Sequence, residues 1–246
     1  IIGGQLTYNK NYVSKLSEAI KAQNEAYLKE DVDVANLFYE GRPQNGIYVV
    51  RSLGIDPANG QEIFLDKDGN RTDIWKASDK VYVGQADPRY RGIANTMFMW
   101  KGLTVNVSAS FYWGGKRYNS TIIDRVEVGR TTLMAQNVDA RALYDRWQKP
   151  GDEAKYKRLI NSVNGSETRP TSRFVMDENT LTFGSLSLTY RMDQQNTRFL
   201  KKSFISSLKW GFTMEDIFYL SSVKQERGLD YPFARQFAIS LNVVFK

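Results

Sequence analysis

A strict alternation of apolar and polar residues runs from Leu103 to Trp113. One set of alternate positions consists of Leu103, Val105, Val107, Ala109, Phe111 and Trp113, and the other of Thr104, Asn106, Ser108, Ser110 and Tyr112. Successive side chains of a β-strand point to opposite faces, so the pattern predicts a strand with one apolar and one polar face. A length of about eleven residues exceeds that of most globular strands but matches the roughly 9–11 residues with which a tilted strand crosses a bilayer.

The last segment of the sequence, 233–245, shows the same alternation. Its apolar positions are Phe233, Phe237, Ile239, Leu241, Val243 and Phe245, and Arg235 interrupts the series. Two such strands predict an all-β protein, an antiparallel transmembrane β-barrel. We expect the lipid-facing side chains to be Leu103, Val105, Val107, Phe111, Phe237, Ile239, Leu241, Val243 and Phe245. The expected lumen-facing side chains are Asn106, Ser108, Ser110, Ser240 and Asn242.

Composition excludes several other classes of protein. The chain has no Cys and no His, which rules out disulfides, thiol nucleophiles and histidine-based catalysis. No run approaches the roughly 18 apolar residues of a membrane-spanning helix. The net charge is +7, but Lys and Arg are scattered, which indicates solvated loops rather than a nucleic-acid surface. We therefore expect no nucleic-acid partner, no metal and no cofactor.

No catalytic constellation emerges from the spacing of polar residues, so we do not expect an enzyme. The acidic residues Asp124, Glu127, Asp139 and Asp145 lie in predicted loops and would need a fold that fixes their separation to act as an acid and a base. The run Asp66-Lys67-Asp68-Gly69-Asn70 departs from a calcium loop, because its Gly comes two positions early and no Glu closes it. We interpret it as a plain turn.

About six long strands account for most of the pattern. We predict strands over 2–8, 93–100, 103–113, 181–190 with a β-bulge at Gly184-Ser185, 204–214 and 233–245. Helices are expected over 14–28 with a start signal at Ser17, over 121–126 and over 139–148. Short β segments are expected over 47–51 and 62–65, joined by a hairpin turn at Asn59-Gly60.

Connection lengths alternate between short and long. The links at Lys101-Gly102 and 193–202 are short, whereas those at 10–90, 114–180 and 216–232 are long. Outer-membrane barrels have short periplasmic turns and long extracellular loops, so the pattern predicts a periplasmic C-terminus. Six strands cannot close a barrel, since small barrels need about eight and plugged transporters about 22. The sequence also begins without an initiator Met or a signal segment, and we expect residues 1–246 to be the C-terminal part of a longer exported polypeptide.

Several motifs resemble the C-terminal third of the barrel of the SusC/RagA-like TonB-dependent transporters, found in the outer membranes of Bacteroidetes. They are Leu53-Gly54-Ile55-Asp56-Pro57-Ala58-Asn59-Gly60-Gln61-Glu62 with Leu65-Asp66-Lys67-Asp68-Gly69, Gly114-Gly115-Lys116-Arg117-Tyr118-Asn119, Arg146-Trp147-Gln148-Lys149-Pro150-Gly151-Asp152 and Leu229-Asp230-Tyr231-Pro232-Phe233-Ala234-Arg235. The resemblance implies a 22-stranded barrel with an N-terminal plug and a TonB box, capped by a SusD-like surface lipoprotein that hands over glycan fragments or peptides. One departure is Lys246 after Phe245, because such barrels commonly end on an aromatic residue.

The function implied by this resemblance is active import of a large nutrient, an oligosaccharide or a peptide, across the outer membrane of a Gram-negative bacterium. Tyr112, Trp113, Tyr118 and Asn119 lie near the outer end of a predicted strand and are our candidates for substrate contact, although Trp113 also suits an aromatic girdle. Two alternatives stay open: a passive porin, and a soluble secreted β-sandwich that binds carbohydrate.

Overall fold

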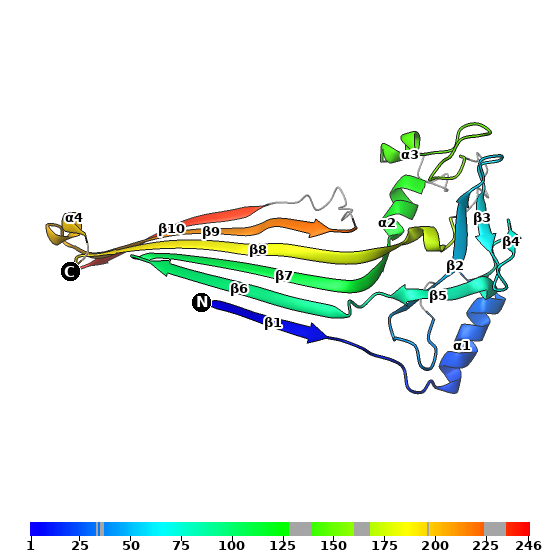
Figure 1. Ribbon diagram of the computed structural model, residues 1–246, viewed down its shortest axis with the longest axis horizontal. Helices are drawn as coiled ribbons and strands as arrows, with labels where there is room; N and C mark the ends of the chain where they lie inside the picture. The colour runs from blue at the N-terminus through cyan, green and yellow to red at the C-terminus, as the bar shows by residue number, and fades with distance from the viewer. Residues whose placement is uncertain (33, 35–36, 128–138, 160–167, 196, 224–234) are drawn as a thin grey trace. The chain divides into compact units, whose positions relative to one another are not determined.

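The computed structural model describes residues 1–32, 34, 37–127, 139–159, 168–195, 197–223 and 235–246 (Figure 1). The chain divides into two compact units. Unit 1 comprises 1–9, 88–114 and 178–246, and unit 2 comprises 10–87 and 115–177. Among the described residues, no helix combines the length and the apolar character needed to cross a membrane.

A six-stranded sheet makes up unit 1. In sheet order its strands are β1 (Ile2–Tyr8), β6 (Tyr90–Trp100), β7 (Leu103–Tyr118), β8 (Val175–Asp193), β9 (Ile205–Ser221) and β10 (Gln236–Phe245). Each strand predicted from alternation is present, and most are longer than predicted. β1 and β10 are the two edges, so the sheet is open. A short helix, α4 (Arg198–Lys201), lies in the β8–β9 connection.

A tight hairpin turn joins β6 to β7, as predicted. Lys101 and Gly102 have φ values of 44° and 89°, and positive φ at both central positions suits the right-handed twist of the flanking strands. The carbonyl oxygen of Gly102 accepts a hydrogen bond from the backbone N–H of Arg191 at 2.8 Å, which ties the turn to β8. A Cβ at position 102 would lie 2.5 Å from the Arg191 oxygen, so this contact also requires Gly.

The predicted β-bulge lies where the alternation slips, but the extra residue belongs to the opposite strand. The register between β8 and β9 shifts between Phe183 and Ser185. Phe183 pairs with Phe218 and Ser185 with Glu215, so β9 holds one residue more than β8 in this interval. Asp216, with φ of 51°, marks the bulge in β9.

Unit 2 contains a four-stranded sheet and several short helices. The order is β4 (Arg71–Thr72), β3 (Glu62–Leu65), β2 (Gly46–Ile55) and β5 (Lys80–Gln85). The first five residues of β2, Gly46–Val50, are buried on both faces. The predicted first helix is α1 (Glu18–Lys29), and Ser17 caps it by accepting a hydrogen bond from Ile20 N–H at 3.4 Å.

A second part of unit 2 packs around short helical turns. These are α2 (Ser120–Ile122), the π-helical turn η2 (Ile123–Glu127), α3 (Arg141–Tyr144) and the 3₁₀ turns η1 (Ala77–Asp79) and η4 (Ser172–Phe174). Side chains from four of these segments and Tyr156, which follows α3, form one apolar cluster: Ile122, Val126, Ala142, Tyr156 and Phe174. The predicted helix over 139–148 is thus confined to four residues.

The long connections have more structure than predicted, and one turn differs from the prediction. The links 10–90 and 114–180, predicted as long extracellular loops containing short helices and short β segments, together form unit 2 with its own sheet and core. The β2–β3 connection is not the two-residue turn expected at Asn59-Gly60, since only Gly60 of that pair has positive φ. Instead the Asp56 carboxylate accepts from Ala58 N–H at 2.9 Å, and Asp56 N–H donates to the Gln61 oxygen at 2.7 Å. Phe233 and most of the motif over 229–235 lie outside the described residues.

Candidate functional site

One face of β6, and of β7 as far as Trp113, is largely apolar. Cross-strand partners of an antiparallel pair share a face, and Leu103 pairs with Trp100, Val105 with Phe98 and Val107 with Thr96. Towards the other end of the pair, Phe111 lies against Gly92, where a Cβ would overlap its ring. The residues predicted to face lipid on β7 therefore lie on one face, with mostly apolar neighbours.

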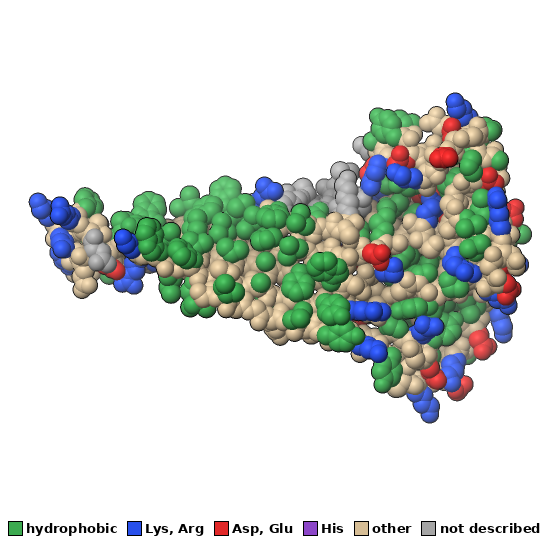
Figure 2. Space-filling model, viewed as in Figure 1, with side chains coloured by type: hydrophobic (Ala, Val, Ile, Leu, Met, Phe, Trp, Pro, Cys, Tyr) green, Lys and Arg blue, Asp and Glu red, His purple; other side chains and the backbone are tan. Residues whose placement is uncertain are grey.

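The same face continues over β8, β9 and β10. Phe237, Ile239, Leu241 and Val243 pair with Met214, Phe212, Trp210 and Leu208. These pair in turn with Leu186, Leu188, Tyr190 and Met192 of β8. Phe237 and Ile239 are 72% and 71% exposed, and Figure 2 shows hydrophobic side chains gathered along these strands. An exposed apolar surface of this extent requires an apolar environment or a partner.

Aromatic side chains bound this apolar face at both ends. At one end lie Trp100, Tyr190 and Trp210, the last two paired across β8 and β9. At the other end Tyr90 pairs with both Tyr8 and Trp113, and the rings of Tyr8 and Tyr90 are 5.2 Å apart. At a rise of about 3.4 Å per residue, Trp100 and Tyr90 lie about 34 Å apart along β6.

The opposite face is largely polar. It holds the predicted lumen residues Asn106, Ser108 and Ser110, which pair with Met97, Asn95 and Ile93. Ser240 lies against Gly211, and Asn242 pairs with Lys209. Sequence reasoning missed the apolar residues Met97 and Ile93 on this face, because β6 reads as a nearly continuous apolar run whose period is weak.

The four candidate substrate residues fall in both units. Tyr112 pairs with Arg91 on the polar face, and Trp113 pairs with Tyr90 on the apolar face. In unit 2, Tyr118 packs against the apolar cluster, and the buried Asn119 caps α2 by accepting from Ile122 N–H at 3.3 Å. Tyr118 and Asn119 thus have structural contacts of their own, and substrate binding by the four residues stays a prediction.

Unit 2 contains a buried network of charged side chains that the sequence did not predict. Arg173 donates to Glu62 Oε2 at 2.9 Å and to both carboxylate oxygens of Glu127 at 2.8 and 2.9 Å. The Thr171 hydroxyl donates to Glu62 Oε1 at 2.8 Å. Burial by itself would lower the pKa of Arg173, but the hydrogen bonds and charges of Glu127 and Glu62 outweigh it and raise that pKa. The network joins residues that are far apart in the sequence, so no local sequence pattern predicts it.

Buried Arg146 satisfies backbone carbonyls next to this network. It donates to the oxygens of Ala142, Val126, Glu127 and Lys157 at 2.7 or 2.8 Å. Burial lowers the pKa of its guanidinium, and the charge of Glu127 opposes this shift. Arg146 thereby holds together the turns around the apolar cluster.

Three of the four acidic residues considered for catalysis form ion pairs. Glu127 pairs with Arg173, Asp139 Oδ2 lies 2.7 Å from an Arg141 nitrogen, and Asp145 lies 3.2 Å from Lys155 Nζ. The described residues contain no group of three or more Asp and Glu arranged to hold a metal ion. The Asp66–Asn70 run is a turn, as predicted: Asn70 N–H donates to Asp66 Oδ1 at 2.7 Å.

Comparison with solved structures shows the fold of this chain. The structure described as the RagAB peptide importer in the "open-open" state has a TM-score of 0.73 at 18% identity, and the match covers 99% of this chain and 26% of that chain. The RagAB peptide transporter gives 0.66 at 19% identity, covering 84% and 23%. The "closed-closed" state of the importer gives 0.62 at 20% identity, covering 83% and 23%. No protein-family model and no curated protein matches the sequence.

The chain therefore has the fold of part of a RagAB chain, and it spans about a quarter of the length of the chains it resembles. The RagA-like fold expected from the motifs is confirmed.

Proposed function

We propose that residues 1–246 form the C-terminal part of a larger transmembrane β-barrel in the bacterial outer membrane. The observation that carries this proposal is the apolar face with aromatic rings at both ends. Trp100 and Tyr90 lie about 34 Å apart along β6, and in a strand tilted by about 40° this distance spans about 26 Å along the membrane normal. That height is close to the roughly 25 Å apolar band of outer-membrane barrels. A bilayer does not tolerate open sheet edges. We therefore infer that further strands continue the sheet beyond β1 and β10 and close a barrel of about 22 strands in total.

The proposed activity of the complete protein is TonB-dependent import of peptides, with a SusD-like lipoprotein as its partner at the cell surface. The similar structures bear the titles peptide transporter and peptide importer, which favours peptides over oligosaccharides as the cargo. In this arrangement the apolar face contacts lipid and the polar face lines the lumen. The short turns and the C-terminus would lie in the periplasm, and unit 2 would belong to the extracellular surface.

Uptake measurements test this activity. Cells that lack the gene are complemented with the complete gene and supplied with radiolabelled oligopeptides or oligosaccharides of similar mass. We expect complementation to restore peptide uptake, and loss of TonB to abolish it. Peptide uptake that persists without TonB would favour the passive porin, and uptake of oligosaccharides alone would overturn the choice of cargo.

Extraction and gel mobility separate the barrel from a soluble secreted β-sandwich. A barrel needs detergent for extraction and changes its mobility on a denaturing gel when heated. A protein released without detergent, with no heat-dependent shift, would overturn the membrane assignment.

A further inference from the structure

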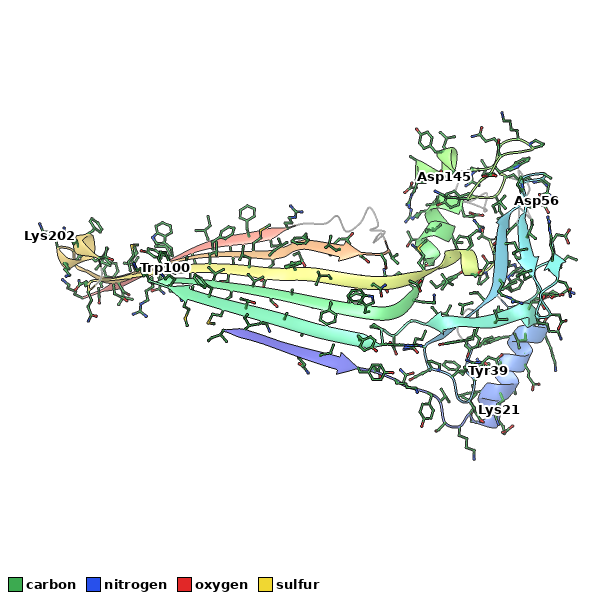
Figure 3. The ribbon with its side chains drawn as sticks, in the orientation of Figure 1. Lys21, Tyr39, Asp56, Trp100, Asp145 and Lys202 are labelled. Carbon is green, nitrogen blue, oxygen red and sulfur yellow. The ribbon has the colours of Figure 1, made fainter. Side chains whose placement is uncertain are left out.

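The end of unit 1 at which β8 turns into β9 carries exposed basic side chains. Arg198, Lys201 and Lys202 are all at the surface, and Lys101 lies in the β6–β7 turn tied to β8. Figure 2 shows Lys and Arg side chains together at this end, where Figure 3 labels Lys202 and Trp100. Within the described part of the chain, Arg198, Lys201 and Lys202 form no ion pair. The nearby acidic residue, Asp193, already pairs with Arg191, Nε to Oδ1, at 3.0 Å.

The turn that presents these charges is well packed. Leu200 of α4 is completely buried. The Gln194 amide crosses the turn and donates to the oxygens of Leu200 and Ile205 at 3.2 and 2.7 Å. Thr197 N–H donates to the Asp193 oxygen at 3.0 Å. The basic residues thus project from an ordered platform, which lowers the entropic cost of binding a ligand there.

Aromatic rings lie beside the charges. Phe199 and Phe204 are 75% and 71% exposed, and Phe204 stacks on Phe245 with ring centroids 5.8 Å apart. Lys101 Nζ lies 5.2 Å from the centroid of the Trp100 ring. Apolar rings directly next to long basic side chains suit the boundary between hydrocarbon and phosphate, where each can reach its preferred layer.

We propose that this end of the sheet, formed by Lys101, Arg198, Phe199, Lys201, Lys202 and Phe204, binds the phosphate headgroups of anionic phospholipids. The inference rests on the proposed membrane location and adds a specific lipid class to it. The guanidinium and ammonium groups pair with phosphate oxygens, while the two Phe rings enter the adjoining acyl region. Each basic residue close to an anionic membrane surface strengthens binding by about fivefold. In the proposed orientation the lipids belong to the periplasmic leaflet.

Lipid titration of the complete protein tests the inference. The protein is purified in an uncharged maltoside detergent and titrated with dioleoylphosphatidylglycerol or dioleoylphosphatidylcholine, and native mass spectrometry reports the lipid retained. We expect a preference of about tenfold or more for phosphatidylglycerol. The variant Arg198→Gln/Lys201→Gln/Lys202→Gln should lose this preference. The matched control Lys67→Gln/Lys76→Gln/Lys149→Gln, which removes equal charge from exposed positions of unit 2, should keep it.

Further arms of the experiment identify the ligand. Phe199→Ser/Phe204→Ser should weaken retention of both lipids and leave the preference between them intact. Excess inorganic phosphate should not displace phosphatidylglycerol. Displacement would overturn the proposal of a lipid ligand and indicate a site for a free anion. A wild-type protein without preference, or an Arg198→Gln/Lys201→Gln/Lys202→Gln variant that keeps the preference, would overturn the inference. Heat-dependent gel mobility, measured on the same samples, shows separately whether a barrel has formed. A protein that keeps this mobility shift but has no lipid preference would overturn the lipid site and leave the proposed membrane location intact.

Discussion

The indole Nε1 of Trp147 donates a hydrogen bond to the carbonyl oxygen of Pro57 at 2.9 Å, although the two residues are 90 positions apart. Gly151 N–H donates to the same oxygen at 2.8 Å. Gly60, with φ of 72°, lies under the indole, and a Cβ there would come within 2.5 Å of Trp147 Cδ2. The segments over 53–62 and 146–152, singled out separately as motifs, therefore pack against each other in unit 2.

Gly60→Ala should destabilise unit 2 by about 1–3 kcal/mol, because the new methyl group meets both an unfavourable φ and the indole ring. Gly54→Ala is the matched control, since Gly54 also has positive φ, 98°, but has open space around it. We expect the control to lower the midpoint of thermal unfolding by clearly less. Equal losses would contradict the role of the Trp147 contact.

Arg173→Met should destabilise unit 2 by about 3–5 kcal/mol, because it leaves the buried carboxylates of Glu62 and Glu127 without their cation. The comparison is Arg71→Met, which removes the ion pair between the exposed Arg71 side chain and Asp56 and should cost less than about 1 kcal/mol. Thermal unfolding of both variants is measured by their sensitivity to a protease as the temperature rises. A loss for Arg173→Met as small as that for Arg71→Met would show that the network contributes little.

Tyr48→Phe should stabilise unit 2 by about 1 kcal/mol at neutral pH, since the buried Tyr48 hydroxyl has no hydrogen-bond partner among the described residues. Burial also raises the pKa of Tyr48 to about 12 from an ordinary value of 10.0. Between these values the folded state keeps a proton that the unfolded state has released, so stability falls as the pH rises through this window. The variant should lose that fall in a pH series of unfolding midpoints. If Tyr48→Phe keeps the same pH dependence as the wild type, the fall in stability is due to another titrating group.

Val107→Arg should destabilise the proposed barrel by roughly 2–4 kcal/mol, because it places a charge near the middle of the proposed lipid face. Asn106→Arg, one position earlier, points to the polar face and should be tolerated. Folding into lipid vesicles, followed by heat-dependent gel mobility, compares the two variants directly. Equal damage from both would contradict the assignment of the two faces.

Alternation predicted most strands of unit 1, because the face of a strand residue depends only on its parity within the strand. The period of β6 is weak, and this strand was predicted from the tight Lys101-Gly102 turn that joins it to β7. The same reasoning located the slip near Gly184, but it could not show that the extra residue, Asp216, belongs to the neighbouring strand. Substrate contact at Tyr118 and Asn119 was predicted from their place after a strand. Their packing against the core and at a helix cap depends on segments that the local sequence does not reveal.

Local sequence therefore determined which segments form strands, where Ser17 begins α1 and where Lys101-Gly102 reverses the chain, since each depends on neighbours within a few residues. Only the tertiary structure decided that two long connections form one compact unit. That unit depends on contacts such as Arg173 with Glu62, 111 positions apart. Contacts at this separation are selected by the packing of the whole chain, and they leave no periodic signal in the sequence.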